Sequence, residues 1–208
     1  MSGAPSRIEQ LRARPAREGA ARFFYRDAGF DTDAVKVLPG EHYVDGDDIM
    51  IVTVLGSCIA ACLHDRVARV GGMNHFMLPD GAGDGGGRYG AYAMELLVNE
   101  LLKRGAQRGR LEAKVFGGGR VMQNFTAINV GEQNTAFVER FLCAERIPVV
   151  SRDVLDVHPR KVCFFPASGR ALVKKLAAAT ASPALADEST YRQRVAAQAP
   201  RAGSVELF

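Results

Sequence analysis

The sequence lacks long apolar runs, paired cysteines and an export signal. No apolar run approaches the roughly 20 residues that a membrane-spanning helix needs, so we expect no membrane insertion. The basic N-terminus has no apolar stretch followed by a small-residue cleavage site, so we expect no secretory signal. Four cysteines form no C-x-x-C pair and four histidines are scattered, which argues against a metal site. Free thiols without an export signal favour a reducing, cytoplasmic location.

The chain also lacks the features of a nucleic-acid-binding module. Its net charge is +4, and six arginines lie in the first 26 residues. A basic segment of this kind could contact nucleic acid, but no recognised reading motif accompanies the arginines. We therefore expect no nucleic-acid partner, and interpret residues 1–32 as a partly flexible N-terminal arm.

From about residue 33 to 178 the sequence alternates between strand and helix patterns. The β-branched stretch at residues 48–55 predicts a buried strand, and residues 160–176 predict a hairpin that turns at 167–169. An apolar stripe at residues 91–106 predicts a helix that ends near Gly105. We therefore expect an α+β fold, a single domain of mixed β-sheets flanked by helices over residues 33–178.

Three further segments are given a local interpretation. Asn129 and Glu132 have the spacing of a capping box, which predicts the start of a second helix. The glycine-rich stretch 80–90 is interpreted as a flexible loop, either an exposed connector or a flap over a site. Beyond residue 178 the composition becomes rich in Ala, Pro and Ser, so residues 179–208 are expected to form a C-terminal tail.

A candidate nucleophile and base lie in "IVTVLGSCIAACLHDRVARVGGMNHFMLP", residues 51–79. A hairpin turning at Arg66-Val67 pairs residues whose numbers add to 133, which places Cys58 directly opposite His75. Their Cβ atoms would be about 4.5–5.5 Å apart on one face. An imidazole at that distance can lower the pKa of a thiol and activate it as a nucleophile. A bulge at Gly71-Gly72 would shift the register by one and separate the two side chains.

The residues before Cys58 favour this interpretation. Gly56-Ser57 permits a sharp bend whose free backbone N–H groups, including that of Ser57, could hold an oxyanion. The alternative is a buried structural thiol beside a core histidine, and a lone Cys/His pair does not decide between the two. The other cysteines, Cys62, Cys143 and Cys163, are interpreted as small core residues.

Several motifs in chain order resemble the CheD family of chemoreceptor glutamine deamidases. They are "TVLGSCIAACLHD", "GGMNHFMLP", "KVFGGGRVM", "NVGEQNTAFV" and "HPRKVCFFPASGRALVKKL", spread over residues 35–176, with a family-like "VELF" at the end. The resemblance implies a fold similar to that of the cytotoxic necrotizing factor type cysteine deamidases. It also implies a cytoplasmic enzyme that converts receptor glutamines to glutamate through a cysteine nucleophile, without a cofactor.

The family's catalytic residues correspond to positions of this chain. The resemblance assigns Cys58 as nucleophile and His75 as base. It assigns a threonine just upstream of the cysteine as third member, for which Thr53 is the candidate in that strand. The glycine corner Gly117, Gly118 and Gly119 is predicted to be a tight turn that lines the substrate groove, since it lacks the Lys-Ser/Thr of a phosphate-binding loop.

Two function classes remain open from the sequence. The first is an amidohydrolase acting on methyl-accepting chemotaxis receptors. The second, also implied by the family, is a non-catalytic adaptor that binds a phosphatase of the chemotaxis response regulator. The intact Cys58/His75 pair favours the first, because an adaptor does not need a reactive thiol.

Overall fold

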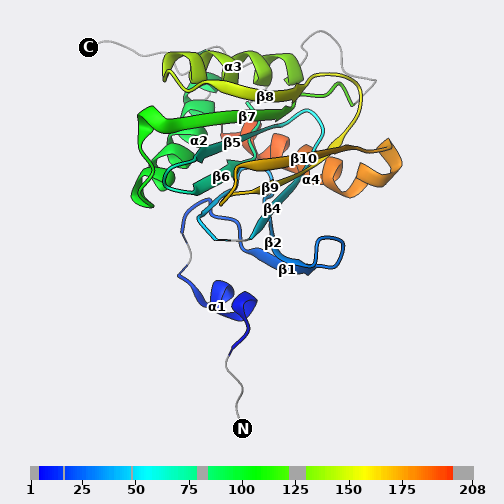
Figure 1. Ribbon diagram of the computed structural model, residues 1–208. Helices are drawn as coiled ribbons and strands as arrows, with labels where there is room; N and C mark the ends of the chain where they lie inside the picture. The colour runs from blue at the N-terminus through cyan, green and yellow to red at the C-terminus, as the bar shows by residue number, and fades with distance from the viewer. Residues whose placement is uncertain (1–4, 16, 48, 79–83, 122–129, 199–208) are drawn as a thin grey trace, which may run out of the picture.

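The computed structural model describes residues 5–15, 17–47, 49–78, 84–121 and 130–198 (Figure 1). Its elements are, in chain order, α1 (Arg7–Ala13), β1 (Phe23–Asp27), β2 (Thr32–Lys36), β3 (His42–Asp45), β4 (Met50–Leu55), β5 (Ile59–Asp65), β6 (Val70–Asn74), α2 (Asp84–Lys103), a 3₁₀ turn (Arg108–Arg110), β7 (Leu111–Gly117), α3 (Val130–Ala144), β8 (Val149–Val154), β9 (Arg160–Phe165), β10 (Arg170–Lys175) and α4 (Ala178–Gln198).

The ten strands form two mixed sheets that pack face to face. One sheet has the order β1-β2-β4-β9-β10 and the other β3-β6-β5-β7-β8. Apolar side chains from both sheets, such as Ile51 and Phe164 from one and Cys62 and Met73 from the other, share one buried cluster. The principal core therefore lies between the sheets, as in a β-sandwich.

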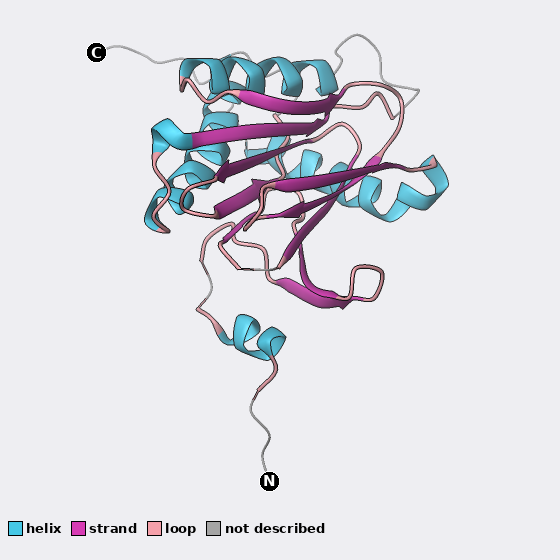
Figure 2. Ribbon diagram, in the orientation of Figure 1, coloured by secondary structure: helices cyan, strands magenta, loops and turns pink. Residues whose placement is uncertain are grey.

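Helices α2 and α3 cover the outer face of the second sheet (Figure 2). Met94, Leu97 and Leu101 of α2 and Val138 and Leu142 of α3 pack in a second apolar cluster, against alternate residues of β5, β6 and β7. Strand β5 is consequently buried along its whole length, since both of its faces are covered. The predicted α+β domain of mixed sheets flanked by helices is confirmed.

The predicted central elements are present, with one correction. The strand at 48–55, the hairpin around 167–169 and the helix ending near Gly105 correspond to β4, β9–β10 and α2. Gly105 has φ 92°, the left-handed conformation common after a helix. The loop predicted over 80–90 is wrong from Asp84 onward, because α2 begins there in spite of its glycines. Asn129 of the predicted capping box lies outside the described residues.

Both terminal segments contribute regular structure. The segment expected to be an arm supplies α1 and β1, and β1 pairs with β2 at the edge of the first sheet. The segment expected to be a tail supplies α4, which starts beyond β10 and returns to pack against β4 (Figure 1). The domain boundaries at residues 32 and 178 stay predictions.

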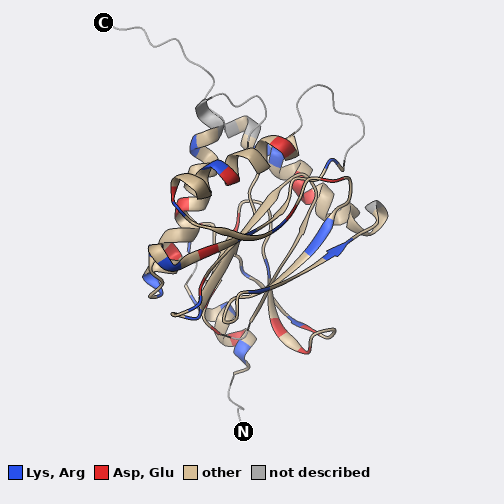
Figure 3. Ribbon diagram, turned by 45° about the horizontal axis from the view of Figure 1, so that its top comes forward, with Lys and Arg blue, Asp and Glu red and all other residues tan. Residues whose placement is uncertain are grey.

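Basic and acidic residues are interspersed along the described elements (Figure 3). No described helix combines the length and apolar character needed to cross a bilayer.

Candidate active site

The Thr53–His75 pair fixes the protonation of the imidazole. Thr53, buried in β4, donates its hydroxyl proton to the Val37 carbonyl at 2.8 Å, and its Oγ1 lies 2.9 Å from Nδ1 of His75. A hydroxyl has one proton, so Oγ1 can only accept from Nδ1. Nδ1 also lies 3.4 Å from the Val37 carbonyl, which is an acceptor as well. The proton of a neutral His75 therefore resides on Nδ1, and Nε2 is the nitrogen that gains and loses the second proton.

Cys58 lies beside this imidazole, although the predicted hairpin register is wrong. The turn spans residues 66–69, so paired residues add to 135 (Asp65 with Val70, Cys62 with Met73) and not to 133. A shift of two residues keeps the side-chain parity of a strand, so Cys58 and His75 still face the same side as diagonal neighbours. Cys58 Sγ and a ring nitrogen of His75 lie within 4.8 Å.

Three successive backbone N–H groups converge in front of Cys58. Those of Gly56, Ser57 and Cys58 donate to the carboxylate of Glu188 over 2.7, 3.0 and 3.4 Å. The Ser57 hydroxyl lies 3.2 Å from the same carboxylate, and Nε2 of His75 lies 3.6 Å from it. Successive N–H groups of this kind form an anion-binding nest. The structure thus places a nest at the bend where the sequence predicted free donors.

The carbonyls of two of these residues are held from the opposite side. The N–H groups of Gly119 and Gly118 donate to the Gly56 and Cys58 carbonyls at 2.7 and 2.8 Å. A Cβ at Gly117, whose φ is 112°, would lie 2.1 Å from the Cys58 carbonyl oxygen. The predicted glycine corner therefore holds the backbone of the nest through its carbonyl groups. A role in lining a substrate groove stays a prediction.

Asn134 of α3 joins the cysteine and histidine segments. Its Nδ2 donates to the Ser57 carbonyl at 2.9 Å, and its Oδ1 accepts from the N–H of Leu78 at 2.8 Å. Because one partner is only an acceptor and the other only a donor, the orientation of the amide is determined. Asn134 is completely buried. It fixes the spacing between the bend that carries Cys58 and the chain that follows His75.

The buried charge of Glu188 disfavours the Cys58 thiolate in this arrangement. Burial, and then the charge of and hydrogen bond to Glu188, raise the pKa of the Cys58 thiol well above its ordinary value. Burial also acts to raise the pKa of Glu188, but a protonated His75, whose Nε2 lies 3.6 Å away, and hydrogen bonds from Gly56 and Cys58 hold that pKa below its ordinary value. Glu188 is therefore a carboxylate in the nest, and Cys58 beside it is a thiol.

The chain is similar to known proteins of one family. A family model described as "CheD chemotactic sensory transduction" matches residues 77–175. A protein of Albidiferax ferrireducens named "Probable chemoreceptor glutamine deamidase CheD 1" is 59% identical over 99% of this chain and 88% of its own length. A Thiobacillus denitrificans protein named "Probable chemoreceptor glutamine deamidase CheD" is 55% identical over 92% of this chain and 97% of its own. This chain belongs to the CheD family.

A likeness to a solved structure adds nothing to the family assignment. A Neisseria meningitidis protein matched by the family model DUF152 aligns with TM-score 0.34 and 11% identity, over 55% of this chain and 51% of that one. Such a score supports no argument. The CheD-family model itself matches from residue 77 onward, beyond Thr53, Cys58 and His75. The roles of these three residues therefore stay predictions, supported by the geometry above.

Cys58, His75 and Glu188 also form the kind of donor set that can hold a divalent metal, with atoms within 4.8 Å of one another. However, one carboxylate oxygen of Glu188 accepts from the Gly56 N–H and the other from that of Ser57. A carboxylate held in this way is characteristic of anion binding. For this CheD-family chain we therefore interpret the cluster as an anion nest beside a thiol.

The remaining cysteines divide into two kinds. Cys62 and Cys163 are buried as predicted, but Cys143 is exposed on α3, so its interpretation as a core residue is wrong. The apolar face of α3 is formed by Phe137, Val138 and Leu142, and the next position along the chain turns outward.

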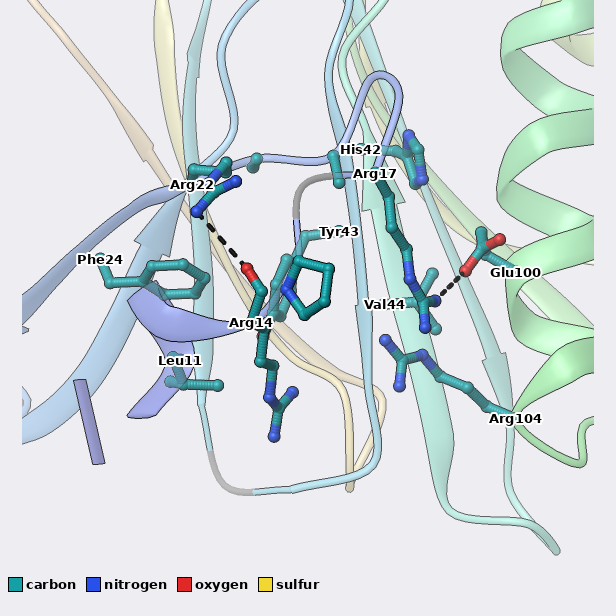
Figure 4. Close-up of a pocket in the computed structure, with 13 residues that line it drawn as sticks. Leu11, Arg14, Arg17, Arg22, Phe24, His42, Tyr43, Val44, Glu100 and Arg104 are labelled. Atoms are coloured by element: carbon teal, nitrogen blue, oxygen red, sulfur yellow. Dashed lines mark hydrogen bonds and ion pairs between the residues drawn. The ribbon is translucent and has the colours of Figure 1, made fainter. Parts of the chain in front are cut away.

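A separate hollow of about 440 Å³ lies between the N-terminal segment, β3 and α2 (Figure 4). Arg14, Arg22 and Arg104 line it, and Arg17 forms an ion pair with Glu100 there at 2.9 Å. None of the predicted site residues is among its lining residues.

Two residues of the site, Glu188 and Asn134, were not predicted from the sequence. Glu188 is 130 residues from Cys58 in a segment interpreted as a tail, and no local pattern marks it. Asn134 lies in "NVGEQNTAFV", one of the stretches by which the chain resembles the CheD family. A polar amide on the otherwise apolar face of a predicted helix was the available signal.

Proposed function

We propose that this chain is a cysteine-dependent protein-glutamine deamidase of chemotaxis receptors. The CheD family and the names of its relatives support this activity and substrate. The observation that carries the proposal is the convergence of a thiol, an imidazole held through Nδ1 by Thr53 and three backbone N–H donors within one buried site. These are the nucleophile, base and oxyanion stabiliser of acyl transfer.

In the first half of the reaction an acyl-enzyme forms. Nε2 of His75 accepts the proton of the Cys58 thiol, and Sγ attacks the side-chain carboxamide carbon of the substrate glutamine. Once the Glu188 carboxylate has left the nest, the N–H groups of Gly56, Ser57 and Cys58 stabilise the oxyanion. His75 passes its proton to the amide nitrogen, the C–N bond breaks and ammonia leaves. The product of this half is a thioester with Cys58.

In the second half water regenerates the enzyme. Nε2 of His75 accepts a proton from water as the oxygen attacks the thioester carbonyl, and the same nest holds the second oxyanion. The C–S bond breaks, the sulfur regains its proton through His75 and the substrate side chain leaves as glutamate. Thr53 keeps Nδ1 protonated throughout, as the third member does in other triads. No step requires a metal or an organic cofactor.

Mapping a purified chemoreceptor cytoplasmic fragment before and after incubation with the protein tests the proposal. We expect glutamine-to-glutamate conversion at specific positions, with one ammonia released per converted site. Absence of both from a folded protein and a folded receptor would overturn the proposal and favour the adaptor function. A cytoplasmic location and a chemotaxis phosphatase as partner are further proposals that rest on family membership.

A further inference from the structure

Helix α4 places a glutamate side chain in the site of a glutamine-converting enzyme. Among the residues of α4 whose side chains the structure describes, the buried ones are Ala181, Glu188, Tyr191 and Val195, and their spacing of seven, three and four defines one helix face. Glu188 is at the centre of that face and is 1% exposed. Its carboxylate occupies the nest beside Cys58 described above.

A glutamate carboxylate is the side chain that deamidation of glutamine produces. We propose that the surface against which α4 packs, called the groove below, is also the docking surface for the substrate helix, and that α4 holds Glu188 there in the position of the product side chain. This inference rests on the proposed function and deepens it, because it makes α4 an internal occupant that must leave the site before the substrate binds. The carboxamide of glutamine has the planar shape of the carboxylate, so its oxygen can accept from the N–H groups of Gly56 and Cys58, which donate to one and the same oxygen of Glu188.

The floor of the groove is shaped for a helix. A Cβ at Gly56 would lie 2.5 Å from Leu185 Cδ2, and a Cβ at Gly40 would lie 2.5 Å from the Tyr191 ring. Both glycines therefore let the helix approach closely. The Tyr191 hydroxyl is 2.6 Å from that of Tyr89 in α2, so the aromatic contact also has a polar partner.

The same contacts predict what the substrate helix carries around its glutamine. Leu185 lies three residues before Glu188 and Tyr191 three residues after it, and both face the enzyme. A substrate helix should therefore present apolar or aromatic residues three positions before and three after the modified glutamine. Glutamines without such neighbours should be converted more slowly.

Helix α4 has features that weaken its hold on the groove, so a substrate helix can displace it. Pro183 lies within the helix and cannot donate to the carbonyl four residues earlier. Asp187, next to Glu188, is half-exposed and forms a 3.7 Å ion pair with Lys36, and exposed pairs of this kind contribute little. Docked α4 lowers the fraction of enzyme that can bind substrate, and apparent affinity falls with that fraction.

The decisive experiment tests whether the enzyme deamidates a glutamine introduced into its own α4. In Glu188→Gln the new glutamine lies in the groove, so Cys58 should convert it back to glutamate. Peptide mass mapping of purified Glu188→Gln should show glutamate at position 188. The double variant Glu188→Gln, Cys58→Ala should retain glutamine there. Gln193, exposed on the same helix, is the matched internal control and should stay glutamine in both proteins.

Receptor turnover provides a second measurement. Glu188→Ala should raise the rate of receptor-fragment deamidation at limiting substrate roughly tenfold or more, because it removes the groove's occupant. The same variant should also speed alkylation of the Cys58 thiol. Asp187→Asn removes a neighbouring charge outside the nest and should stay near the wild-type rate in both assays. A deamidation rate that falls in Glu188→Ala would make Glu188 part of the machinery and overturn the inference.

The outcomes separate this inference from the proposed function. If the Glu188→Gln protein keeps its introduced glutamine while wild type converts the receptor, the docking inference is wrong and the deamidase stands. If the introduced glutamine is converted but no receptor glutamine is, the groove assignment stands and the receptor is the wrong substrate. If neither is converted by folded protein, the deamidase proposal fails, and this inference with it.

Discussion

Replacing Thr53 with valine should slow deamidation while leaving the fold intact. The substitution keeps the branched shape of the buried side chain and removes only the hydroxyl that accepts from His75 Nδ1 at 2.9 Å and donates to Val37 at 2.8 Å. Thr53 is a positioning residue, because its hydroxyl contacts the imidazole and the Val37 carbonyl and acts on the substrate only through His75.

The size of the effect follows from those two bonds. A buried donor left without its partner costs about 1–3 kcal/mol, and the cost rises when the imidazole becomes charged during proton transfer. At about 1.4 kcal/mol for each tenfold, kcat should fall roughly ten- to a hundredfold. KM should change little, since the lost hydroxyl contacts no substrate.

Steady-state deamidation of a receptor fragment measures both constants, and Thr53→Ser serves as the matched control. The serine variant retains the hydroxyl and should recover most of the lost kcat. A valine variant as fast as wild type would refute the tautomer argument. A serine variant as slow as valine would show that the methyl group, and not the hydroxyl, is what matters.

Three further substitutions test the supports of the site and of the fold. Asn134→Leu removes both hydrogen bonds of the side-chain amide. It should lower kcat by roughly tenfold or more, measured by turnover, and the unfolding free energy by about 2–3 kcal/mol, measured by urea unfolding. An unchanged kcat would contradict the positioning role of Asn134. Gly117→Ala should reduce stability by about 3 kcal/mol or more in the same unfolding assay, because its Cβ would meet the Cys58 carbonyl; a neutral result would show that the corner can relax. Asp65 is buried, which acts to raise its pKa, but hydrogen bonds from Arg110 and three backbone N–H groups hold that pKa below its ordinary value of 3.8. The stabilisation from the Asp65 carboxylate is therefore present above pH 3.8 and lost as the pH falls through the lowered pKa. Asp65→Asn should cost about 3 kcal/mol of unfolding free energy at neutral pH and progressively less below pH 3.8, measured by unfolding at a series of pH values. A penalty independent of pH would argue against the ion pair with Arg110.

Local sequence patterns predicted the elements whose contacts are near in the chain. The strand β4 and the hairpin β9–β10 were identifiable because a run of β-branched residues and a glycine-containing turn indicate them locally. The β5–β6 register was predicted two residues off, because Arg69 adopts φ 54° and lengthens the turn to four residues. The parity of the strand nevertheless kept Cys58 and His75 on one face.

Long-range features of the site were beyond local reasoning. The N–H groups that hold the Cys58 and Gly56 carbonyls belong to Gly118 and Gly119, which lie about sixty residues from Cys58 in the chain. Glu188 is farther still, and the alanine-rich composition around it has a weak apolar pattern, so a tail was the natural prediction. Its helix is buried chiefly where Tyr191, Val195 and Glu188 itself meet the sandwich.

The central claim is that Cys58 converts receptor glutamines to glutamate. The most direct measurement maps receptor peptides after incubation with wild type, Cys58→Ala and, as a matched cysteine control, Cys143→Ala, whose thiol is exposed on α3. The account predicts conversion by wild type and Cys143→Ala and none by Cys58→Ala. Conversion by Cys58→Ala at the wild-type rate would remove this thiol from the mechanism and contradict the account.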